Sequence, residues 1–134
     1  MSPRSLALAF LALALPACKD LFGPDYSVRV DWIRAVVDST STLRITYVVR
    51  NVGQDSQLVG WCSGDFNPYL EKKRGSEWRS YAGGVCPANQ YPYKWLAPHS
   101  ALESSLAVQH VQSGEAMRIA LNHGGPFSQP IPIP

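Results

Sequence analysis

The alternation of apolar and polar side chains over Thr42–Val52 constrains the fold of this chain more than any other feature. Successive side chains of a strand point to opposite faces of a sheet. One face of this segment carries Leu43, Ile45, Tyr47 and Val49, and the other carries Arg44, Thr46, Val48 and Arg50. A period of two residues predicts a half-buried β-strand.

Further short segments have strand character, and no stretch keeps a helical period for more than two turns. Ser27–Val37 is rich in valine, isoleucine and tryptophan, and its alternation slips near Ile33-Arg34, which predicts a β-bulge. Arg74-Gly75-Ser76 predicts a hairpin turn with a positive φ at Gly75. Residues 51–55 and 96–100 are expected to form turns and 82–95 a loop. The other predicted strands are Gln57–Cys62, Tyr69–Lys73, Glu77–Tyr81, one through Leu102, Ser104, Leu106 and Val108, and a last one through Met117, Ile119 and Leu121.

Composition supports an all-β domain. Charged residues make up 16% of the 134 residues, and the chain contains 10 glycines and 11 prolines. Few charges, many turn formers and short strands at regular spacing predict an antiparallel β-sandwich with one disulfide, over residues 27–123. The proline-rich tail, residues 124–134, is expected to be extended and exposed because prolines cannot donate ladder hydrogen bonds.

Two groups of residues resemble known modules. The segment Thr46-Tyr-Val-Val-Arg50-Asn51-Val-Gly53 resembles a strand edge of bacterial immunoglobulin-like domains. Residues 70–79 followed by 96–100 resemble the later half of the intracellular proteinase inhibitor (BsuPI-like) family. The resemblance covers residues 43–108 and implies an immunoglobulin-type sandwich; no inhibitory residue carries over to this sequence.

The N-terminus has the layout of a secretory signal. Arg4 precedes an apolar run, Leu6–Leu15, and Ala17 precedes Cys18. A cysteine at this place resembles the signal of a bacterial lipoprotein, which implies cleavage after residue 17 and acylation of Cys18. Secretion with a different cleavage site and a membrane-spanning helix are the alternatives. Ten apolar residues rise about 15 Å as a helix, roughly half of a membrane span.

The signal implies a lipid-anchored protein of the cell envelope. Residues 18–26, with Gly23-Pro24, are expected to tether the domain to the lipid. Lys19 stands where an aspartate retains many lipoproteins at the inner membrane, so the outer membrane is favoured in a cell with two membranes. Cleavage of residues 1–17 from the 134 leaves 117, enough for one domain.

The cysteine count agrees with export. With Cys18 assigned to lipid, Cys62 and Cys86 remain and are predicted to form a disulfide that closes a loop of about 25 residues. A redox or catalytic thiol is the alternative, but neither cysteine has a histidine or a second cysteine near it in the sequence.

No motif points to catalysis, a metal or a cofactor. His99, His110 and His123 lack the spacing of metal ligands, and neither a serine nucleophile elbow nor a phosphate-binding loop is present. Glu71 and Glu77 could face each other across the hairpin, but a hairpin tip is the wrong setting for acid–base chemistry. A formal net charge of +2, which includes Arg4, gives no basic surface for nucleic acid.

Aromatic residues are the candidates for binding. Trp61, Tyr91, Tyr93 and Trp95 flank the two predicted disulfide cysteines and could stack on sugar rings or anchor a protein. The alternative is that these rings fold back and cap the core. Lys72-Lys73-Arg74 could contact anionic groups or simply form a solvated hairpin tip. We therefore expect a non-catalytic binding module with a protein or carbohydrate partner in the envelope; an envelope protease inhibitor and a small hydrolase with an unrecognised site are the alternatives.

Overall fold

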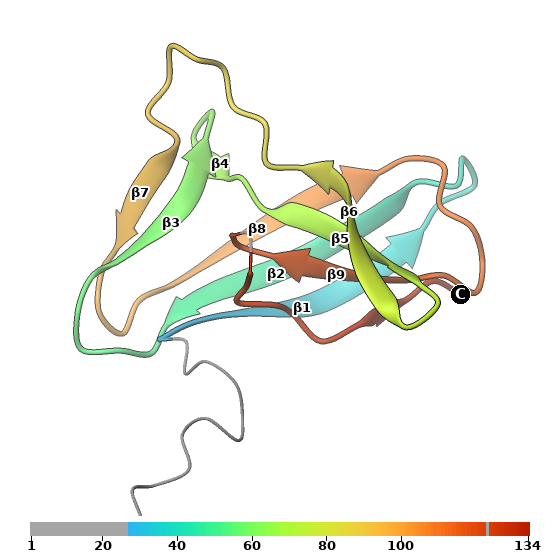
Figure 1. Ribbon diagram of the computed structural model, residues 1–134, viewed down its shortest axis with the longest axis horizontal. Coiled ribbons are helices and arrows are strands. Elements are labelled where there is room, and N and C mark those ends of the chain that lie inside the picture. The colour runs from blue at the N-terminus through green and yellow to red at the C-terminus, as the bar shows by residue number, and fades with distance from the viewer. Residues whose placement is uncertain (1–26, 123) are drawn as a thin grey trace, which may run out of the picture.

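The computed structural model describes residues 27–122 and 124–134 (Figure 1). The predicted signal peptide, Cys18, the tether and His123 lie outside the described residues. Within them the chain forms ten strands and no helix. None of the described residues belongs to a helix that could cross a membrane. The strands are β1 (Val28–Val37), β2 (Leu43–Asn51), β3 (Gln57–Cys62), β4 (Asp65–Phe66), β5 (Tyr69–Arg74), β6 (Glu77–Gly83), β7 (Tyr93–Leu96), β8 (Ala101–Val108), β9 (Ala116–Ala120) and β10 (Ile131–Pro132).

All strand pairs are antiparallel and form three sheets. One sheet has the order β1-β2-β8, a second β10-β9-β5-β6 and a third, smaller one β4-β3-β7. The bulge predicted in the first strand is confirmed, because the register of β1 against β2 shifts between Trp32 and Arg34. The hairpin turn between β5 and β6 is confirmed as well, with φ of 62° at Gly75.

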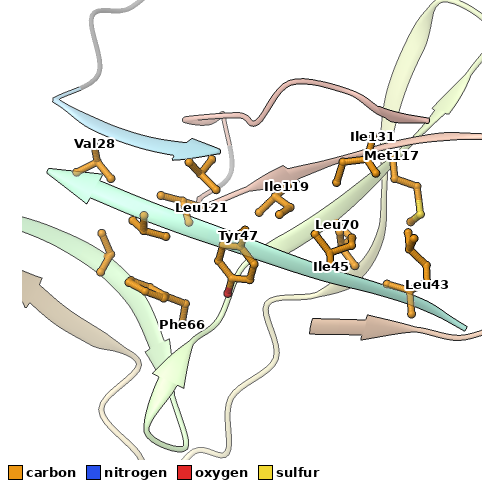
Figure 2. Packing of buried hydrophobic residues seen from close by; sticks show 14 of the residues in the cluster. Val28, Leu43, Ile45, Tyr47, Phe66, Leu70, Met117, Ile119, Leu121 and Ile131 are labelled. Carbon is orange, nitrogen blue, oxygen red and sulfur yellow. The ribbon is translucent and has the colours of Figure 1, made fainter. Parts of the chain in front are cut away.

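The three sheets contribute side chains to one hydrophobic core (Figure 2). The inward face of β2 is the predicted one, and Leu43, Ile45 and Val49 are fully buried. From the second sheet Leu70, Met117, Ile119 and Ile131 reach the same cluster, and from the third sheet Val59 and Leu96 do so. Burial of this apolar surface is the main stabilising contribution to the fold.

The expected exposure of residues 124–134 is wrong. Ile131 and Ile133 are 0% and 4% exposed, and β10 pairs with β9. The backbone N–H of Ile133 donates to Glu115 O (2.8 Å) and that of Ser128 to Ile119 O (2.8 Å). Proline alternates with isoleucine here, so the residues without an N–H, Pro130, Pro132 and Pro134, are the exposed ones. A proline-containing strand is tolerated because it lies at the edge of its sheet.

Candidate binding surface

The predicted aromatic residues lie on a structural unit that we call the aromatic arm, made of β3, β7 and the connecting segment 84–92. Figure 1 shows the arm extending away from the two larger sheets. The sequence predicted a loop over 82–95, but β6 continues to Gly83 and β7 begins at Tyr93. The loop therefore shortens to residues 84–92, and the carbonyl of Pro92, just before β7, accepts a hydrogen bond from Trp61 N (2.9 Å).

The register of β7 against β3 separates the four candidate aromatic residues into two faces. Gly60 lies opposite Tyr93 and Leu58 lies opposite Trp95, so these positions share one face. Trp61 belongs to the other face, because neighbouring residues of a strand alternate in direction. The structure therefore does not bring Trp61 together with the tyrosines and Trp95.

Three of the four rings are exposed. The exposed fractions are 71% for Tyr91, 45% for Tyr93 and 64% for Trp95. The rings of Tyr91 and Tyr93 contact each other edge to face, with centroids 5.9 Å apart. Val85, at the other end of the 84–92 segment, is 86% exposed. Capping of the core does not account for these side chains, which leaves a large apolar surface open to a partner.

Trp61, in contrast, does cap the core. Its ring packs edge to face on Phe66, with centroids 5.1 Å apart, and Phe66 lies 6.3 Å from Tyr47. The ammonium of Lys94 lies 4.1 Å from the centroid of the Trp61 ring. This row of rings joins the arm to the core and fixes its position.

Tyr47 is the deepest ionisable group in this row. Burial raises the pKa of its hydroxyl to about 12; the hydrogen bond with Ser104 acts in the opposite direction and the charge of Asp65 in the same direction. The Ser104 hydroxyl in turn donates to the Asp65 carboxylate at 2.7 Å, which ties β8 to β4. Tyr47 is therefore neutral at physiological pH and contributes to packing.

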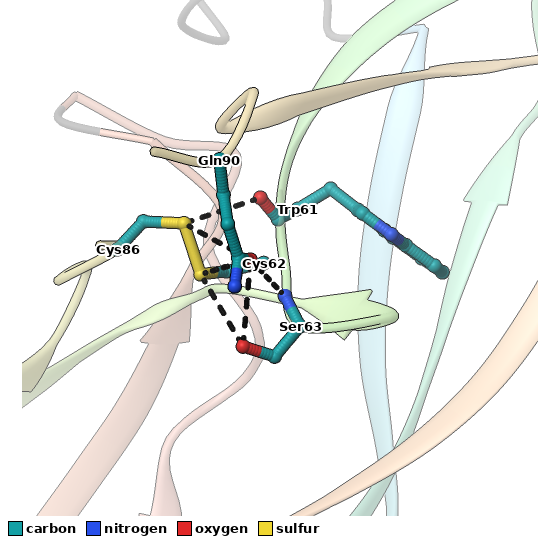
Figure 3. The surroundings of a disulfide bond; sticks show 5 residues. All are labelled: Trp61, Cys62, Ser63, Cys86 and Gln90. Atoms are coloured by element: carbon teal, nitrogen blue, oxygen red, sulfur yellow. Dashed lines mark hydrogen bonds between the residues drawn. A yellow bond between two sulfur atoms is a disulfide. The ribbon is translucent and has the colours of Figure 1, made fainter. Parts of the chain in front are cut away.

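The segment 84–92 is fixed at both ends (Figure 3). The predicted disulfide Cys62–Cys86 is present, with a Cα–Cα distance of 5.8 Å. The side-chain oxygen of Gln90 accepts a hydrogen bond from Ser63 N (2.9 Å), and Gln90 N donates to Pro87 O (3.1 Å). These contacts reduce the conformational entropy that the segment would lose on binding a partner.

The aromatic arm carries little charge. No aspartate or glutamate occurs between Glu77 and Glu103, and Lys94 is the one charged residue of β3 and β7. An apolar, aromatic and weakly cationic surface does not suit an acidic or basic substrate. It does suit stacking and apolar contact.

Of the predicted basic tip of the β5–β6 hairpin, Lys72 is paired and partly buried, whereas Lys73 and Arg74 are exposed. Lys72 forms an ion pair with Glu115, and the pKa of Glu115 is lowered first by the hydrogen bond from Lys72. Glu71 and Glu77 do not face each other: Glu71 lies opposite Ser80 and pairs with Arg118 (2.6 Å). The register set by the hairpin turn places Glu77 opposite Arg74, three residues along β5 from Glu71, and so separates the two carboxylates.

Within the part of the chain that the structure describes, neither the histidines nor the pockets bring together a catalytic arrangement of side chains. His99 lies in a turn with φ of 55° and contacts Gln54, and His110 is also at a positive φ. No group of three His, Cys, Asp or Glu side chains among residues 27–122 and 124–134 is arranged to hold a metal ion. A groove of about 580 Å³ between β6 and β8 has a mostly apolar lining: Phe66, Asn67, Pro68, Leu70, Tyr81, Ala82, Gly83, Leu106, Ala107, Val108 and Gln109.

Comparison of the chain with models of protein families, with curated proteins and with solved structures finds no match. The function therefore has to be argued from the surface itself. Of the predicted residues, the structure brings together Tyr91, Tyr93 and Trp95. Leu58 and Val85 are two further exposed residues of the arm. In the sequence each is an ordinary apolar residue that nothing marks as part of a binding surface.

Proposed function

We propose that the protein is a lipid-anchored, non-catalytic interaction module of the cell envelope. The signal layout that ends at Cys18 supports the anchor, and the exposed rings of the aromatic arm support the interaction. The three exposed rings Tyr91, Tyr93 and Trp95 on a covalently fixed, acid-free segment are the observation that carries the proposal.

We propose further that the two larger sheets form an immunoglobulin-type sandwich. In such a sandwich strands A, B and E share one sheet, and the second has the order G-F-C-C′. The orders β1-β2-β8 and β10-β9-β5-β6 correspond to A-B-E and G-F-C-C′ when the strands are taken in chain order. In this reading the aromatic arm is an addition to the sandwich, and its cystine is not the inter-sheet cystine of antibody domains.

The lipid anchor is tested by metabolic labelling with palmitate. Cys18→Ala should abolish the label and leave either an uncleaved precursor or a soluble protein. Cys62→Ser is the matched control, because it removes a cysteine that the proposal does not assign to lipid and should keep the label. A labelled, membrane-bound Cys18→Ala protein contradicts the anchor.

The binding surface is tested by cross-linking in intact envelope. Tyr93→Ala is compared with Tyr81→Ala, because Tyr81 on β6 is a tyrosine of similar exposure (40%) outside the arm. Removing a ring from a binding hot spot costs about 2 kcal/mol or more, roughly a thirtyfold loss of affinity. The cross-linked product should disappear with Tyr93→Ala and persist with Tyr81→Ala. Equal yields from both variants contradict the assignment of the arm.

An envelope protease inhibitor is the second candidate function. The 86% exposure of Val85 beside the fixed Cys86 favours it, because inhibitors present a rigid, exposed loop to the protease. Incubation with envelope proteases distinguishes the two candidates. An inhibitor leaves 84–92 intact and slows hydrolysis of a reporter peptide, whereas an interaction module does not change that rate.

A further inference from the structure

The part of the aromatic arm around Trp95 lies beside the point where the chain enters the domain. Ser27 precedes β1, and its carbonyl accepts a hydrogen bond from Val52 N (2.7 Å). The adjacent Asn51 donates from its side chain to Leu96 O (2.9 Å). Figure 1 shows the start of β1 and the end of β7 at the same end of the molecule. We call this the entry end.

Apolar side chains are exposed at the entry end. Trp95 is 64% exposed, Val52 44% and Leu58 37%. Leu58 lies opposite Trp95 and lines the same hollow, of about 130 Å³, as Ser27. Tyr91 and Tyr93 lie farther along the arm, because β7 runs from Tyr93 toward the entry end. The arm thus has a basal part, Trp95 and Leu58, and a distal part, Tyr91 and Tyr93.

Charged side chains occupy successive outward-facing rows of the neighbouring sheet β1-β2-β8. Arg29 and Arg50 lie opposite each other in the outward-facing row nearest the entry end, and both are exposed. The next outward row, one step farther from that end, contains Asp31 and Glu103 on either side of Val48. Arg29 and Arg50 thus place two exposed cationic side chains in the row nearest the entry end, with an acidic pair in the row behind them.

We infer that the entry end docks on the phospholipid bilayer, with the Trp95 ring in the interfacial region. The inference rests on the proposed acylation of Cys18. Nine residue steps from Cys18 to Ser27 span at most about 30 Å, so the anchor holds the entry end close to the headgroups. Tryptophan prefers the membrane interface because its ring is apolar and its N–H is polar.

Arg29 and Arg50 complement anionic headgroups, which attract basic residues near the membrane surface. Docking of the basal part leaves the distal part, Tyr91 and Tyr93, farther from the bilayer. The membrane therefore orients the module, and the distal part stays available to a partner.

Quenching of tryptophan fluorescence by brominated phospholipid tests the docking. The acylated full-length protein is purified from envelope and reconstituted into vesicles of phosphatidylethanolamine and phosphatidylglycerol with brominated chains. Quenching is expected, and Trp95→Phe should remove most of it. Trp78→Phe is the matched control: Trp78 lies on β6, at the opposite end of Figure 1, and stacks on Arg118 (4.6 Å), so its loss should leave the quenching intact.

Vesicle flotation separates failure of the anchor from failure of the docking. A protein that does not float with vesicles overturns the anchor and the docking together. A protein that floats, but whose Trp95→Phe variant is quenched as strongly as the unaltered protein, overturns the docking alone. The docking alone is also overturned if a cross-linked protein or a second copy of the chain, and not the bilayer, covers Trp95.

The charge pair gives an independent readout. The double variant Arg29→Gln, Arg50→Gln keeps Trp95 and the anchor. It should lose quenching in vesicles that contain phosphatidylglycerol and behave like the unaltered protein in vesicles of phosphatidylcholine alone. Equal quenching of the double variant and the unaltered protein in both vesicle types contradicts the role given to the arginines.

Discussion

Asn51→Ala is expected to destabilise the domain by about 3 kcal/mol, from three hydrogen bonds of about 1 kcal/mol each. Asn51 ends β2 and is 1% exposed. Its side-chain nitrogen donates to Asp55 O (2.8 Å) and Leu96 O (2.9 Å), and its side-chain oxygen accepts from Gly53 N (3.0 Å). One side chain therefore joins β2, the turn that follows it and the end of β7. Alanine leaves the Leu96 carbonyl without this donor in a buried site, which is why the loss should be felt in full.

Urea unfolding followed by tryptophan fluorescence measures this loss. With a slope of about 1.5 kcal/mol per molar urea, a loss of about 3 kcal/mol lowers the midpoint by about 2 M. Asn51→Asp keeps the acceptor for Gly53 but removes both donors and places a charge in the buried site. It should be at least as unstable as Asn51→Ala.

Gln54→Ala is the matched control in the same turn. The Gln54 side chain is exposed and contacts His99 (3.2 Å), so its removal should change stability by less than about 0.5 kcal/mol. A loss below 1 kcal/mol for Asn51→Ala would refute the reasoning, as would an Asn51→Asp protein as stable as the unaltered one. Either result would mean that replacing the three hydrogen bonds with hydrogen bonds to water does not change the free energy of unfolding.

Three further predictions concern the core, the arm and the pH dependence of stability. Ile131→Ala should cost about 2–5 kcal/mol because Ile131 is fully buried, whereas Pro132→Ser, at an exposed position, should be nearly neutral; equal midpoints in urea would mean that the tail does not pack on the core. Cys62→Ser should lower the free energy of unfolding by about 3 kcal/mol, and an unchanged melting curve under non-reducing conditions would argue against a contribution from the bridge. Because burial raises the pKa of Tyr47 to about 12, the unfolded chain loses this proton first, so stability should fall as the pH rises from about 10 to 12. Tyr47→Phe should reduce that slope, and an identical slope in both proteins would assign it to other groups.

The strands that the sequence predicts best are those in which apolar and polar side chains alternate, although Val48, on the face of β2 expected outward, is buried as well (6% exposed). In β2 the residues expected inward, Leu43, Ile45 and Val49, are fully buried, and the bulge after Trp32 lies where the alternation slips. These features are local, because the pattern of side chains along one strand already predicts which face packs on the core. The cystine is predictable for a related reason, because two cysteines allow a single bridge.

The tail and the arm show where local patterns fail. Prolines in residues 124–134 indicate an exposed segment, yet Ile131 and Ile133 are buried. The tail pairs with the edge of β9, and an edge strand tolerates prolines because the positions that lack an N–H face solvent. The same holds for Tyr93–Leu96, which becomes a strand only because β3 lies beside it. In both segments, a partner strand distant in the sequence decides that the residues form a strand.

The candidate binding surface likewise has features that the sequence shows and features that only the fold decides. The aromatic residues at 61, 91, 93 and 95 are visible in the sequence, and so are the two cysteines that bridge their segments. Only the register of β7 on β3 decides that Trp61 turns to Phe66 while Tyr93 and Trp95 face outward. The position of Trp95 beside the chain's start is likewise set by hydrogen bonds between Asn51 and Leu96, which are 45 residues apart. Composition and periodicity describe one segment at a time, whereas a surface is made by segments that only the folded chain brings together.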